Sequence, residues 1–137
     1  MSDAAARIET REDAQRLLAG APFHEALGLQ LIEWGDGTVT LHFEPPALVR
    51  SPENNAVHGG ALMTALDTAA CFAAISAVGL DCTTVDLRAD FLRPALDDQF
   101  RVDGTVLRAG RRFAWADATI AASDGRTIAT ARGTFSW

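Results

Sequence analysis

Cysteine is scarce in this chain of 137 residues, which contains only Cys71 and Cys82. Two cysteines at this spacing match no metal-binding pattern and are too few for a disulfide framework. We therefore expect two reduced thiols that pack as small apolar side chains. No other residues stand at metal-ligand spacing, so the predicted chemistry uses no metal and no other cofactor.

An excess of positive charge is also lacking. Lys and Arg together number 12 and Asp and Glu together number 18, which gives a formal net charge of −6. Domains that bind nucleic acid usually carry a basic patch on a basic surface, so we expect no nucleic acid as a partner. Local arginines can still hold an anionic ligand, because the attraction depends on the local field.

The N-terminus lacks the apolar segment of a signal peptide, since Met1-Ser2-Asp3 opens a polar and charged stretch. We therefore expect a cytoplasmic protein. Internal repeats, low-complexity tracts and linkers rich in Pro or Gly are also missing, and the length fits one domain. We predict a single domain over residues 1–137, in which residues 1–21 form an N-terminal helical extension.

Short helices and a hairpin are predicted first. Residues 10–19 indicate a surface helix capped by Thr10, and residues 23–27 indicate a further helical turn that ends at Gly28. Residues 29–34 and 38–43 flank a Gly-Asp-Gly turn, which is typical of a β-hairpin.

Residues 59–78 form the longest apolar run, and Asp67 is its one charged residue. A helix that is apolar on every side either crosses a membrane or lies in the centre of a core. This run is rich in Ala, and Asp67 would cost about a few kcal/mol in lipid. Strands also follow it directly. We therefore predict a buried central helix and no membrane partner.

Alternation with period two follows the helix. Val85, Leu87, Ala89 and Phe91 are expected on one face of a strand, and further strands are expected at about 100–108, 113–120 and 127–137. The arrangement that buries the central helix is an α+β fold in which a strongly curved antiparallel sheet wraps around it. The last side of the helix needs a partner, which a second copy of the chain can supply.

The segment His58–Gly60, with Asp67 nine positions after the histidine, resembles the hotdog-fold acyl-CoA thioesterases of the phenylacetyl-CoA-degradation type. Thr84–Leu87 running into Phe91–Ala95 matches the strand that follows the helix in that family, and the resemblance covers about residues 22–137. It implies the hotdog fold, hydrolysis of an acyl- or aryl-acyl-CoA to free acid and CoA, and a homo-oligomer that is a dimer or a dimer of dimers.

The resemblance also implies catalytic roles for four residues. The Gly59 N–H polarises the thioester carbonyl, because the first amides of a helix are unpaired and carry the positive end of its dipole. Asp67 attacks directly or activates water, Thr84 holds the carboxylate or that water, and His58 orients the thioester. Each residue also has a structural interpretation: a helix cap for His58, a close backbone approach for Gly59, a core hydrogen bond for Asp67 and an ordinary strand position for Thr84.

Spacing adds a constraint on His58 and Asp67. Nine residues of helix separate them by about 13 Å along the axis and turn them to opposite faces. One chain cannot easily aim both at one thioester. Two antiparallel central helices related by a two-fold axis can, with His58 and Gly59 of one subunit facing Asp67 of the other.

Residues for substrate binding are predicted less directly. The family usually has Asn six positions before the histidine, where this chain has Pro52, so Asn54 and Asn55 are the nearby candidates. Gly60 lets the substrate approach the backbone. Guanidinium groups suit phosphate, which makes three arginines candidates for CoA: Arg93, Arg111 and Arg112.

Two other functions remain open from the sequence. A hotdog enoyl-CoA hydratase would use Glu53 and His58, which lie five residues apart, and would not need Asp67. A non-catalytic protein that binds acyl-CoA would retain its ligand without cleaving it. A panel of acyl-CoA esters with detection of free thiol separates these possibilities from a thioesterase.

Overall fold

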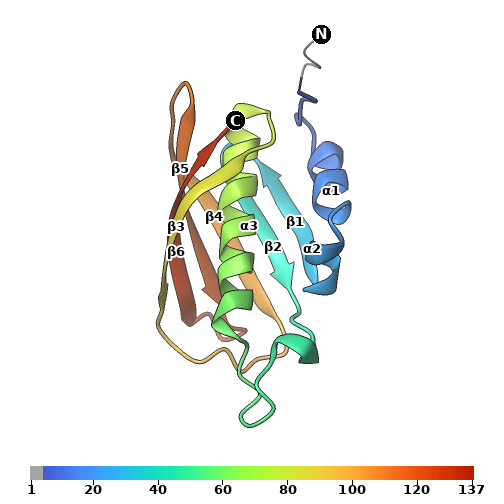
Figure 1. The fold of residues 1–137 in the computed structure, drawn as a ribbon, viewed down its shortest axis with the longest axis vertical. Coiled ribbons are helices and arrows are strands. Elements are labelled where there is room, and N and C mark those ends of the chain that lie inside the picture. Colours follow the sequence, from blue (N-terminus) through green and yellow to red (C-terminus); the bar gives the residue numbers. More distant parts are fainter. Residues whose placement is uncertain (1–4) are drawn as a thin grey trace.

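The computed structural model describes residues 5–137 (Figure 1). Its elements, in chain order, are α1 (Arg11–Ala19), α2 (Pro22–Ala26), β1 (Leu29–Gly35), β2 (Thr38–Phe43), the 3₁₀ turn η1 (Ala47–Val49), α3 (Gly59–Val78), β3 (Thr83–Phe91), β4 (Phe100–Ala109), β5 (Phe113–Ala121) and β6 (Thr127–Ser136). The capped helix, the hairpin and the central helix all form where the sequence predicts them.

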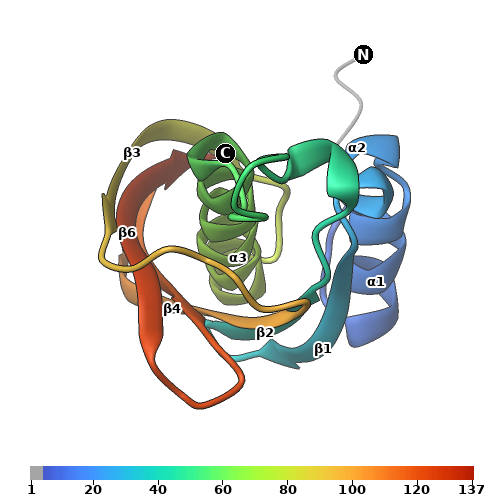
Figure 2. The same cartoon turned by 90° about the horizontal axis from the view of Figure 1, so that it is seen from below.

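The six strands form one antiparallel sheet in the order β1-β2-β4-β5-β6-β3. Figure 2 shows the sheet curling around α3, with α1 and α2 beside β1. The predicted hotdog fold is therefore confirmed. The extension predicted for residues 1–21 contains α1, and its first four residues lie outside the described part of the chain.

Small residues let α3 lie directly on the sheet. A side chain at Gly104 of β4 would overlap the Ala69 carbonyl oxygen, so only glycine fits there. On β5, Ala114, Ala116 and Ala118 are buried against the helix. Within residues 5–137, α3 alone is long and apolar enough to cross a membrane, but 61% of its most apolar window is buried inside this fold. The apolar character of α3 is thus explained by the core.

The two edge strands, β1 and β3, have different surroundings. Helix α1 packs beside β1 and begins with the predicted cap, in which Thr10 and Asp13 bond each other's backbone amides. Arg11 Nη2 donates to the carbonyl oxygens of Leu31 and Ile32 on β1, at 3.3 and 3.2 Å. Strand β3 runs for nine residues along the opposite edge.

Strand β3 departs from the predicted alternation. Thr84 pairs with Phe135 and Asp86 pairs with Thr134, so Val85 is an extra residue in a β-bulge. Val85 is 54% exposed, whereas Leu87 and Ala89 are partly buried against the core. The prediction that Val85 shares their face was wrong, because a bulge interrupts the period of two on which it relied.

Candidate active site

The start of α3 leaves one backbone amide free. The Gly60 N–H donates to His58 Nδ1 at 2.9 Å, and the Ala61 and Leu62 N–H groups donate to the His58 carbonyl. The His58 N–H donates to Val49 O at 2.7 Å, which fixes the approach to the helix. Among residues 5–137, the Gly59 N–H has no hydrogen-bond partner. This amide therefore offers a hydrogen bond and the positive end of the helix dipole to a ligand.

His58 combines the cap with an available ring nitrogen. Because Nδ1 accepts from Gly60, the proton of the neutral ring lies on Nε2. The residue is exposed, so this N–H can donate to a group at the start of the helix. The cap role foreseen as an alternative is present, and it leaves the second nitrogen free for a ligand.

Asp67 and Thr84 meet on the other flank of α3. The Thr84 hydroxyl donates to Asp67 Oδ1 at 2.7 Å, and both residues are half-buried. The bulge at Val85 is the cause, since a regular strand with Asp86 facing outward would also turn Thr84 outward. A hydroxyl that donates to a carboxylate fixes its orientation.

His58 and Asp67 occupy different flanks of α3, as their spacing predicts. His58, Gly60 and Thr64 line a groove beside α2, whereas Asp67 faces β3 and does not line this groove. A single described chain therefore brings Asp67 to Thr84 and His58 to Gly60. Within one chain, the pair of Asp67 and Thr84 lies apart from the pair of His58 and Gly60.

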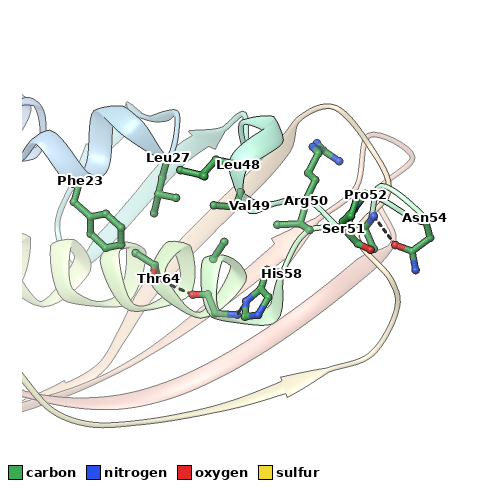
Figure 3. A pocket seen from close by; sticks show the side chains of 14 residues that line it. Phe23, Leu27, Leu48, Val49, Arg50, Ser51, Pro52, Asn54, His58 and Thr64 are labelled. Carbon is green, nitrogen blue, oxygen red and sulfur yellow. Dashed lines mark hydrogen bonds between the residues drawn. The ribbon is translucent and has the colours of Figure 1, made fainter.

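Two hollows adjoin the start of α3. The larger groove has a volume of about 590 Å³ and lies between α2, η1 and the first turns of α3 (Figure 3). The smaller hollow, of about 360 Å³, is lined by Gly59 together with Phe91, Leu92, Arg93 and Pro94. A ligand whose reacting atom lies at Gly59 can thus extend in two directions.

The loop before α3 explains the positions of both asparagines. Asn54 lies at the groove, and its side-chain oxygen accepts from the Ala56 N–H at 3.0 Å in a local turn. Asn55 has a positive φ of 61°, which asparagine tolerates better than most residues. Asn55 lines neither of the two hollows.

Arg50 holds this loop and was missed by the sequence reasoning. Its guanidinium donates to the backbone carbonyls of Pro45, Asn55 and Asp97, at 3.3, 3.0 and 2.6 Å. It therefore ties the loop to the β3–β4 connection. The signal in the sequence was weak: one arginine in a loop of mixed polarity after two prolines.

The remaining candidates lie apart from one another. Arg93 lines the smaller hollow and donates to Thr127 O at 2.6 Å. Arg111 and Arg112 are exposed in the β4–β5 turn, at the end of the molecule where α3 finishes (Figure 1). Glu53 is exposed in the loop and lines neither hollow. The pair required by the hydratase alternative therefore does not share a pocket.

The two cysteines are free thiols near Asp67. Burial, together with the nearby Cys82, Asp67 and Asp81, raises the pKa of Cys71 well above its usual range. Burial and Asp81 raise the pKa of Cys82 to about 12. Both groups therefore stay protonated at neutral pH, which makes them poor nucleophiles and leaves Asp67 as the reactive candidate on this flank.

Sequence comparison finds related proteins. Residues 54–129 match the family model of the thioesterase superfamily. A medium/long-chain acyl-CoA thioesterase of Salmonella typhimurium, YigI, is 32% identical, over 83% of this chain and 84% of that protein. A putative esterase of Halobacterium salinarum is 30% identical, over 97% of this chain and 91% of that protein.

Solved structures with a similar fold are also found. A protein from the thioesterase superfamily has a TM-score of 0.86 at 31% identity, covering 90% of this chain and 95% of its own. The Escherichia coli PaaI protein from the phenylacetic acid degradation operon has a TM-score of 0.84 at 25% identity, covering 91% of this chain and 90% of its own.

Proposed function

The chain belongs to the thioesterase superfamily, and from this premise we propose that it hydrolyses acyl-CoA with Gly59 and His58 as the electrophilic side of the site and Asp67 as the base or nucleophile. The observation that carries the proposal is the half-buried Asp67 carboxylate, which the Thr84 hydroxyl holds at 2.7 Å. A carboxylate kept partly out of water needs such a partner, and a positioned carboxylate is suited to this reaction.

The carbonyl is polarised at the start of α3. The free Gly59 N–H donates to the thioester oxygen, where negative charge develops as the carbon becomes tetrahedral. His58 Nε2 donates to the same thioester and fixes its orientation. Gly60 has no side chain to obstruct the approach.

Asp67 promotes the replacement of sulfur by oxygen. It either removes a proton from water as that water bonds to the carbonyl carbon, or bonds to the carbon itself and is then released by water. In both cases the carbon–sulfur bond breaks, the sulfur leaves as CoA and takes up a proton, and a free acid remains. Thr84 positions the carboxylate or the water.

A dimer joins the two halves of the site. Two features of the chain need a cover. One is the open edge of β3, and the other is a half-buried stripe on α3 that contains Met63, Thr64, Asp67 and Cys71. A second copy related by a two-fold axis provides this cover. His58 and Gly59 of one subunit then face Asp67 of the other. Two such dimers assemble further into a tetramer.

CoA contacts are assigned to polar groups around this site. Arg93 lies at the smaller hollow beside Gly59, and Asn54 lies at the groove, so each can meet part of the substrate. Asn55 acts through the loop whose turn it forms. Arg111 and Arg112 lie near the end of α3, which an antiparallel partner helix would bring beside the other subunit's site, where they bind phosphate.

The activity is tested by the release of free thiol from a panel of acyl-CoA esters. We expect turnover of at least one ester in the presence of EDTA, because the proposed site acts through amides and a carboxylate. Complete loss of activity in EDTA with recovery in zinc would contradict this.

The cytoplasmic location stays a prediction.

The shared site is tested by mixing two inactive variants. His58→Ala and Asp67→Ala homodimers are each impaired at both sites. After unfolding and remixing in equal amounts, random pairing makes about half of the dimers hybrid, and each hybrid has one intact site, so about a quarter of all sites should recover. Native mass spectrometry verifies the hybrids. Activity that stays at the average of the two variants would exclude a site shared in this way.

A further inference from the structure

The groove beside α2 changes character along its length. Phe23 of α2 lies toward one end, His58 lies beside the start of α3, and Asn54 of the preceding loop lies beyond His58 at the other end (Figure 3). Leu27, Leu48 and Val49 form the wall between Phe23 and His58. An apolar stretch of the groove thus adjoins the start of α3 at His58 and Gly60.

Large apolar side chains at this groove contact water in the described chain. Leu48 on η1 is 88% exposed and Phe23 is 59% exposed. Water contact of two such side chains at one concave surface is unfavourable, and a ligand that covers them gains about 25 cal/mol for each Å² of apolar surface removed from water.

Two polar side chains at the groove, Thr64 and Arg50, are engaged within the protein. The Thr64 hydroxyl donates to Gly60 O at 3.0 Å. Arg50, the one guanidinium in the lining, is engaged by four backbone carbonyls. No carboxylate belongs to the lining. The stretch from Phe23 to Val49 therefore suits an uncharged hydrocarbon and not the phosphates of CoA.

A thioester carbonyl carries two substituents, the acyl chain and CoA, and two hollows adjoin the start of α3. The smaller hollow contains Arg93, which suits the CoA branch. The larger one is apolar from Phe23 to Val49, and its volume of about 590 Å³ is within the range of about 300–1,000 Å³ usual for small-molecule sites. We propose, resting on the thioesterase function above, that this groove holds an aliphatic acyl chain and that Leu48 and Phe23 set its length.

The experiment measures kcat/KM for butanoyl-, hexanoyl-, octanoyl-, decanoyl- and dodecanoyl-CoA. Each added methylene should raise kcat/KM about fourfold until the groove is filled, because burial of one methylene contributes about 0.8 kcal/mol. Leu48→Ala should lower the value for decanoyl-CoA about tenfold and leave butanoyl-CoA unchanged. Phe23→Ala, at the far end, should affect only decanoyl- and dodecanoyl-CoA.

Control variants remove exposed apolar side chains of the same types elsewhere. Leu107→Ala and Phe113→Ala, at positions 50% and 39% exposed and outside the groove, should leave the chain-length profile unchanged. An equal loss for butanoyl- and decanoyl-CoA in Leu48→Ala would overturn the proposal. So would a change of oligomeric state in Leu48→Ala, since the groove would then be a subunit interface.

Binding distinguishes failure of this inference from failure of the proposed function. In an Asp67→Asn background, isothermal titration with decanoyl-CoA should give a Kd about tenfold higher after Leu48→Ala. An unchanged Kd would overturn the acyl-chain assignment whether or not the protein is active. Absence of thiol release from every ester, with this Kd effect intact, would overturn the hydrolase proposal and support the groove.

Discussion

The two edge strands carry the same irregularity and use it differently. β1 has a bulge at Ile32 and β3 has one at Val85, and these apolar residues are 47% and 54% exposed. At β1, Arg11 of the adjacent helix binds the carbonyls around the bulge and so covers the edge. At β3, the bulge turns Thr84 toward Asp67.

The two edges differ in whether they can pair with another chain. An uncovered strand presents free N–H and C=O groups to another chain. Helix α1 protects β1 from such pairing, whereas β3 keeps its edge open beside the proposed catalytic carboxylate. Assembly and catalysis are thus expected to depend on β3 and to be insensitive to β1.

The largest effect is expected from Asp67→Asn. This change removes the carboxylate beside β3 and should lower kcat by about 10² or more, the scale of a positioned acid–base group, while substrate still binds. Steady-state kinetics with a thiol reagent measures it. Glu53→Gln is the control and should change little. The reverse ranking of the two variants would favour the hydratase alternative.

Val85→Lys tests the open edge. A two-fold interface contains Val85 twice, so the substitution removes two buried valines from each dimer. The dimer loses about 3 kcal/mol of binding free energy in total, and its Kd should rise about a hundredfold. Sedimentation velocity over a dilution series measures the shift. Ile32→Lys makes the same change at the bulge of the covered edge and should leave assembly intact. Equal effects of both variants would remove the distinction between the edges.

Thr84→Val tests what the β3 bulge contributes to the site. The variant keeps the shape of the side chain and loses the hydrogen bond to Asp67. We expect kcat to fall about tenfold, the lower range for a hydrogen bond to a charged group, and Thr84→Ser to restore most of it. Unchanged kcat in Thr84→Val would make this threonine an ordinary strand residue.

Thr10→Ala should have the smallest effect. It removes the N-cap of the helix that covers β1 and should lower the free energy of unfolding by about 1 kcal/mol. Urea denaturation measures this change, and kcat should stay at the wild-type value. A loss of activity larger than the loss of stability would show that the β1 edge also serves the site.

Much of the fold could be predicted because its signals are local. Thr10 with Asp13 marks a helix start, Gly-Asp-Gly marks a hairpin, and the uninterrupted apolar run of 59–78 marks a buried helix. Each depends on hydrogen bonds or periodicity within a few neighbouring residues. The motif from His58 to Asp67 likewise indicated the candidate site residues.

The amino-acid sequence by itself determined the elements, their order, the family resemblance and the candidate residues. Tertiary structure alone decided that Thr84 reaches Asp67, that Arg50 fixes the loop before α3, and that an apolar groove opens beside His58. The physical reason is that these features depend on partners far apart in the chain. The bulge that turns Thr84 depends on the register of the neighbouring strand. The carbonyls that bind Arg50 depend on the path of another loop. The groove depends on side chains from several elements.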